Sequence, residues 1–216
     1  KCETSHGVSF LKRYFDVGEV VGFNRNTEEA MRSPLSSPRW KALTTDDLRH
    51  ALRTWSFEKA LALVVYGHIS TWDTSCIAYM SCLFYDQPYF NEDISSWDVS
   101  KVTDMDHLFY GCISFNQPLN KWNVSQVTNM SGLFDSAVIF NQPLDLWDVH
   151  NVKNMSEMFR SCRCFNQPLS MWNVANVTNM SSMFCNAIIF NQPLTHWNVS
   201  KVTNMYKMFS NALQFN

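Results

Sequence analysis

Large apolar residues recur every 25 positions across the last two thirds of the chain, and polar residues between them keep the same spacing. One column is tryptophan: Trp72, Trp97, Trp122, Trp147, Trp172 and Trp197. Two phenylalanine columns, beginning at Phe84 and Phe90, and a methionine column beginning at Met80 repeat in phase with it. A fixed period of this size predicts a stack of structural repeats, each burying its apolar face against its neighbours.

Two shorter periods lie within each repeat. In the unit that starts at Phe115, Leu119, Trp122 and Val124 end in the alternation of a half-buried strand. The next apolar positions follow helical steps: Val127, Met130, Leu133, Phe134, Ala137 and Phe140. An Asn-Gln-Pro turn then closes the unit. The prediction is an α/β repeat solenoid of the leucine-rich-repeat type, with short parallel strands, short helical segments and about six 25-residue rungs.

A helical cap is expected to precede the repeats. Thr44 or Thr45, followed by Asp46 and Asp47, resembles a helix start, since acids are favoured at that end. The apolar face of this helix would be Leu48, Ala51, Leu52 and Trp55, and a second helix is expected over 56–65. The predicted organisation is an extension over 1–43, a cap over 44–71 and the solenoid over 72–216.

The extension has no repeat and is broken by glycines and prolines, yet it is rich in apolar residues. Phe10, Tyr14, Phe15 and Phe23 are its main aromatic side chains. Two interpretations stay open, a segment packed on the first repeat of its own chain or an arm that docks on another subunit.

Composition narrows the function. The formal net charge is −2 with no basic stripe, so nucleic-acid binding is not expected. The longest apolar run, 60–66, is too short to span a bilayer. Seven cysteines leave at least one unpaired, and most are interpreted as small core residues; free thiols favour a reducing compartment, with the cell surface as the alternative. We find no catalytic, metal or cofactor motif, and expect no enzyme activity, cofactor, metal or small-molecule substrate.

The positions flanking each tryptophan are the candidates for function, because they should point away from the core. The best predicted contact surface, here named the contact face, comprises Lys121, Asn123, Leu146, Asp148, His150, Met171, Asn173 and His196. Its centre is mildly apolar. The acidic or amide column after each tryptophan would be either a cation or polar-ligand ladder or a set of side chains bonded to the backbone and to neighbouring rungs.

Two further asparagine patterns arise from the repeat itself. The column Asn91, Asn116, Asn141, Asn166, Asn191 and Asn216 is expected to form a structural ladder at the turn. Six glycosylation sequons occur, at Asn123, Asn129, Asn154, Asn176, Asn179 and Asn198, but because the repeat consensus creates them they do not imply attached glycans.

The repeat consensus F-N-Q-P-L-x-x-W-[DN]-V-S-x-V-T-N-M-S-x-M-F resembles the BspA-type leucine-rich-repeat surface proteins, also called the DUF285 or mycoplasma lipoprotein-associated repeat. The stretches Leu48 to Trp55 and Tyr66 to Asp73 resemble the entry segment of copies found in many unicellular algae. The resemblance implies a non-enzymatic role in adhesion or protein contact. We therefore expect a protein-binding scaffold, an accessory subunit of a larger complex, with a cell-surface adhesion module as the alternative.

Overall fold

The computed structural model describes residues 39–216, and the four aromatic residues of the predicted arm, Phe10, Tyr14, Phe15 and Phe23, lie outside this range. The chain divides into two compact units, 1–38 and 39–216. The division therefore falls five residues before the boundary predicted at residue 43. The reason is Trp40 and Lys41: the Trp40 ring packs edge-on against Trp72 at 5.1 Å, and Lys41 forms a parallel bridge with Asp73.

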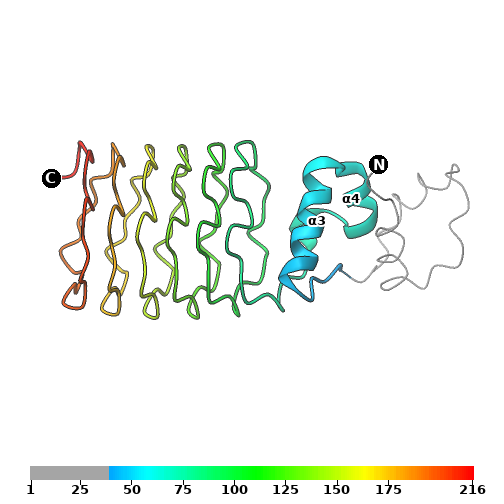
Figure 1. Ribbon diagram of the computed structural model, residues 1–216, viewed down its shortest axis with the longest axis horizontal. Coiled ribbons are helices and arrows are strands. Elements are labelled where there is room, and N and C mark those ends of the chain that lie inside the picture. The colour runs from blue at the N-terminus through cyan, green and yellow to red at the C-terminus, as the bar shows by residue number, and fades with distance from the viewer. Residues whose placement is uncertain (1–38) are drawn as a thin grey trace, which may run out of the picture. The chain divides into compact units, whose positions relative to one another are not determined.

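Two α-helices precede the repeats (Figure 1). Helix α3, Thr45–Phe57, starts at an N-cap, Thr44, whose side chain and that of Asp47 form a reciprocal capping box. Its buried residues are those predicted, Leu48, Ala51, Leu52 and Trp55. Helix α4, Lys59–Tyr66, begins later than the predicted residue 56, since Glu58 leaves helical geometry at φ −138°. A 3₁₀ turn, η1 (Ile69–Thr71), leads into the first repeat.

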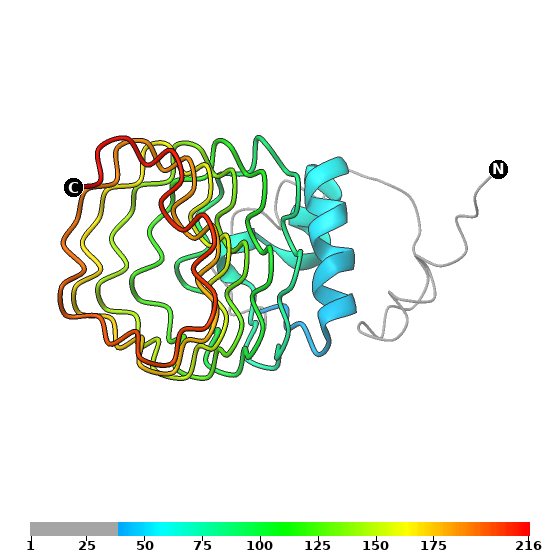
Figure 2. The same cartoon turned by 60° about the vertical axis from the view of Figure 1, so that its left-hand side comes forward.

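From Trp72 onward each 25-residue unit makes one coil, and successive coils lie side by side (Figures 1 and 2). The aromatic columns fill the interior as stacks: Phe134 lies 5.7 Å from Phe159, and Trp147 lies 6.4 Å from Trp172, between ring centroids. Each tryptophan is also held by its ring nitrogen. The Trp147 Nε1–H donates to the Leu119 carbonyl of the preceding coil at 2.9 Å, and the other coils repeat this bond.

Backbone pairing between coils does not occur where the strand was expected. Around Trp122 the N–H groups are used within the coil, since Trp122 donates to Leu119 and Val127 donates to Val124. Apart from the Lys41–Asp73 bridge at the cap, parallel pairing in the described part of the chain consists of single bridges in another column: Tyr79, Asp104, Asn129, Asn154, Asn179 and Asn204. Local turns thus replace the short strand predicted for 119–124.

The expected helical segment is also replaced. Gly132 and Ser136 have positive φ values of 56° and 62°, and the equivalent residues of other coils share this geometry. The two left-handed residues of each coil lie four positions apart. Each one ends a helical turn, and alternate N–H groups therefore point to the next coil. Met130, Gly132 and Phe134 donate to the coil that follows, at 2.8–2.9 Å.

This ladder has a direction, because each coil offers its carbonyls to the coil before it. The first coil has no preceding coil, and helix α3 takes that place. Thr45 Oγ1 donates to the Tyr79 carbonyl at 2.9 Å, and the Arg49 guanidinium donates to the Ser81 carbonyl at 3.0 Å. Side chains of the cap thereby satisfy acceptors that would otherwise form an open edge.

The asparagine ladder at the turn is confirmed. The Asn116 side chain accepts from the Asn141 backbone N–H at 2.9 Å, and each neighbouring pair repeats the bond. Cys112 and Cys162 are buried and free, and each thiol donates to a phenylalanine carbonyl of the preceding coil. The other described cysteines, Cys76, Cys82, Cys164 and Cys185, are exposed or partly exposed, so the prediction that most cysteines are small core residues is wrong for the described part of the chain.

Candidate protein-contact face

The contact face lies on the outside of the coils, at the residues next to each buried tryptophan. Leu146 and Met171 have 69% and 79% of their surface exposed, whereas Trp147 and Trp172 beside them have 3% and 2%. The stacked tryptophans fix the spacing of the two exposed side chains, which occupy the same column in adjacent coils. The face therefore combines a rigid base with two adjacent apolar side chains.

Polar residues surround this apolar pair. Lys121 and His196 occupy the same column one coil to either side, and both are exposed. His150 Nδ1 lies 2.7 Å from Asp148 Oδ1, and this hydrogen bond is the main cause that lowers the pKa of Asp148 below its ordinary value. An apolar centre with a polar rim is the usual anatomy of a protein interface.

The acidic and amide column after tryptophan serves the backbone of its own coil. The side-chain oxygens of Asn123, Asp148 and Asn173 each accept from the backbone N–H two residues later at 3.2 Å. These Asx turns fix the loop that follows the tryptophan. They support the structural interpretation of this column, although the bonds are made within one coil and not to neighbouring rungs.

One buried carboxylate lies on a different side of the coil. Asp135 has 2% of its surface exposed, accepts from Ser136 Oγ at 2.9 Å and lies 3.6 Å from the Arg160 guanidinium. Burial raises its pKa above the ordinary value, against the opposing effects of Ser136 and Arg160. Within residues 39–216 no group of three or more His, Cys, Asp or Glu side chains could hold a metal ion.

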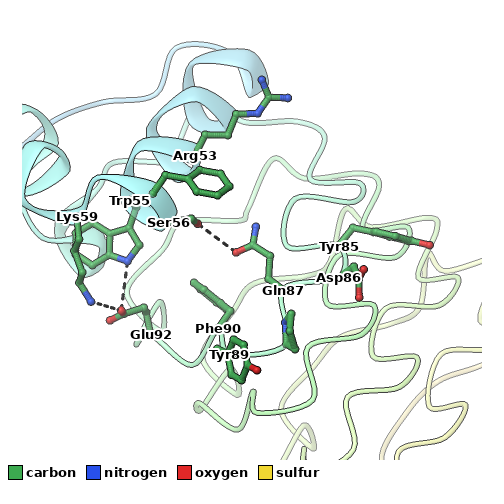
Figure 3. A pocket seen from close by; sticks show the side chains of 12 residues that line it. Arg53, Trp55, Ser56, Lys59, Tyr85, Asp86, Gln87, Tyr89, Phe90 and Glu92 are labelled. Atoms are coloured by element: carbon green, nitrogen blue, oxygen red, sulfur yellow. Dashed lines mark hydrogen bonds and ion pairs between the residues drawn. The ribbon is translucent and has the colours of Figure 1, made fainter.

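The sequence analysis missed a pocket of about 610 Å³ between the end of α3 and the first coil (Figure 3). Its exposed rings include Phe57 and Tyr89. A signal for it existed in the sequence, because the first coil departs from the consensus here. Gln87 and Tyr89 stand where later coils have a small buried residue and a serine, cysteine, isoleucine or glutamine.

Residues 53–163 and 140–216 match the family model described as "Mycoplasma protein of unknown function, DUF285". The chain belongs to this family. The matches include the end of helix α3 and every coil of the DUF285 repeat array. No curated protein and no solved structure matches the chain. No helix among residues 39–216 has the length and apolar character needed to cross a membrane.

Proposed function

We propose that this DUF285 protein is a leucine-rich-repeat-like solenoid that acts as a non-enzymatic protein-interaction scaffold, an accessory or structural subunit of a larger assembly. The observation that carries the proposal is the exposure of Leu146 and Met171 in adjacent coils. Neither side chain contributes to the buried columns, yet both are held in register by the tryptophans beside them. Repeat arrays use such outward columns to bind extended partner surfaces.

The partner is expected to be a protein with an apolar centre at its contact surface. Leu146 and Met171 supply the apolar area, and unbranched methionine adapts to irregular surfaces. Lys121, Asp148 and His196 offer charged or hydrogen-bonding groups at the rim, where they favour orientation more than affinity. The hydrogen bonds that order the face already exist within each coil, so little ordering entropy is lost on binding.

Site-specific photo-crosslinking tests the proposal. A photoreactive phenylalanine replaces Met171 in the protein expressed in its source cells, and Val64, 74% exposed on helix α4, is the matched control position. The expected result is one recurring protein adduct at position 171, absent at position 64 and lost when Leu146→Asp is added. Equal, diffuse adducts at both positions, or an adduct that is unaffected by Leu146→Asp, would refute the contact face.

The alternative is a cell-surface adhesion module, and exposed sequons are the observation that favours it. Asn123, Asn176 and Asn198 are exposed, and Asn123 belongs to the contact face. A glycan there would cover part of that face. Mass spectrometry of the protein from its source cells distinguishes the two: bare sequons with reduced thiols favour the assembly subunit, and occupied sequons favour the adhesion module.

A further inference from the structure

The pocket between the cap and the first coil has a firm polar wall (Figure 3). Glu92 Oε1 accepts from Lys59 Nζ at 2.5 Å and from the Trp55 ring nitrogen at 3.4 Å, and Lys59 also lies 4.8 Å from the Trp55 ring centroid. Ser56 Oγ donates to Gln87 Oε1 at 3.5 Å. These groups satisfy one another, so they hold the wall together and are not the groups that select a ligand.

Exposed aromatic rings border the opening. Phe57 is 85% exposed, Tyr89 is 88% exposed and Tyr85 is 47% exposed. An aromatic side chain this exposed can bury a large apolar area when a partner covers it. The Tyr85 ring is held in place by stacking on Tyr110, with 4.4 Å between centroids and 8° between planes. Pro88 lies between Tyr85 and Tyr89 in the sequence and limits the conformations of this loop.

Among the described residues that line the pocket, Asp86 and Arg53 are the two charged side chains without an ion pair. Its side chain lies beside Tyr85 in Figure 3, whereas the Arg53 side chain extends away from Gln87. Within the described residues Asp86 forms no ion pair, in contrast to Glu92, which is paired with Lys59. A ligand that fits this arrangement has apolar rings or rigid apolar segments for the aromatic side chains and a positive charge for Asp86.

We propose that this pocket binds an extended, proline-rich segment of a partner protein that carries a basic residue beside its prolines. Polyproline II segments dock against clustered aromatic side chains, and little conformational entropy is lost because the segment is already extended. The volume of about 610 Å³ is in the range of specific binding sites. Phe57, Tyr85 and Tyr89 contact the prolines, and the Asp86 carboxylate pairs with the basic side chain. The site is separate from the contact face and does not depend on it.

Fluorescence anisotropy with the full chain tests the proposal, using labelled decaproline, decaproline ending in arginine, and a glycine–serine peptide ending in arginine. We expect the arginine-containing decaproline to bind best and the glycine–serine peptide not to bind. Tyr89→Ala should weaken binding at least about tenfold, the size of effect expected for an aromatic anchor. Tyr206→Ala, which removes a tyrosine 65% exposed in the last coil, should leave binding unchanged.

Asp86→Asn tests the charge separately. Asparagine tolerates the positive φ of 54° at this position, so the variant should fold. It should reduce binding of the arginine-containing probe to that of plain decaproline. Absence of saturable binding by either proline probe to the folded chain would overturn the proposal, as would unchanged binding in Tyr89→Ala. Binding of chitohexaose in place of both peptides would overturn it in favour of a carbohydrate site.

Discussion

Replacement of Trp147 by alanine is the sharpest test of the stacked core. The Trp147 ring is 3% exposed, lies 6.2 Å from Phe134 and 6.4 Å from Trp172, and donates its ring N–H to the Leu119 carbonyl. Loss of a buried tryptophan side chain costs about 3–5 kcal/mol of unfolding free energy. The Leu119 carbonyl also loses its donor, so we expect a value at the upper end of that range.

Two companion variants separate the contributions to this loss. Trp147→Phe retains much of the stacking but leaves the Leu119 carbonyl without its donor, and should cost about 1–3 kcal/mol. Leu146→Ala changes the neighbouring residue, which is 69% exposed, and should change stability by no more than about 0.5 kcal/mol. This control distinguishes a core effect from a general effect of substitution in this turn.

Equilibrium urea unfolding, followed by far-ultraviolet circular dichroism, measures all three variants. Because stability in a repeat array depends on contacts between neighbours, a defect in the middle of the array should also lower the m-value if the two sides unfold separately. A loss below about 1 kcal/mol for Trp147→Ala would refute the placement of this ring in the core. A Leu146→Ala loss as large as that of Trp147→Ala would refute the assignment of the two positions to inside and outside.

Gly132→Ala should destabilise the array by about 1–2 kcal/mol, because the residue is left-handed at φ 56° and the added Cβ would lie 2.6 Å from the His107 ring. Partial recovery of stability in the His107→Ala background, measured by urea unfolding, would confirm that the clash with His107 contributes to the loss. Burial raises the pKa of Cys112 to about 12, so mass spectrometry after iodoacetamide treatment at neutral pH should find exposed Cys164 alkylated and Cys112 unmodified in the folded chain. Burial also raises the pKa of Asp135, so the folded state binds this proton more tightly than the unfolded state, and its contribution to stability should fall as pH rises from the ordinary value of 3.8 through the raised value. Asp135→Asn should lack this fall in a series of urea unfolding curves measured at different pH values. If the stability of Asp135→Asn falls with pH as much as that of the unaltered chain, the fall does not come from Asp135.

The periodic part of the fold could be predicted because it depends on residue identity at fixed spacing. The tryptophan and phenylalanine columns are buried in every coil that has neighbours on both sides, and the asparagine ladder follows directly from its column. The start of helix α3 was also predictable, since Thr44 and Asp47 form a capping box that the sequence shows. In each case one residue type is required by one physical role.

The path of the backbone within a coil could not be predicted in the same way. One column of left-handed residues holds six different residue types, so residue type gives no common signal there: Cys82, His107, Gly132, Glu157, Ser182 and Lys207. The spacing of Met130, Leu133 and Phe134 predicts a helix. Turns separated by left-handed residues bring the same three side chains to one side, so the spacing does not distinguish the two structures. The hydrogen bonds to the next coil decide between these structures, and they depend on the stack as a whole.

The stack also explains why surface function and stability can vary independently in this chain. Each coil is held by buried rings, by the Asx turns after tryptophan and by N–H groups that donate to the next coil. The position before tryptophan takes no part in the core, and it holds Lys121, Leu146, Met171 or His196 without a change in the tryptophan beside it. Substitutions there should alter the exposed surface of the array while the free energy of the stack stays nearly constant. The same reasoning holds for Tyr89 and Phe57 at the pocket, since their rings are outside the buried columns. If either proposed site binds a partner, a single exposed substitution there should therefore remove the binding in a chain that remains folded.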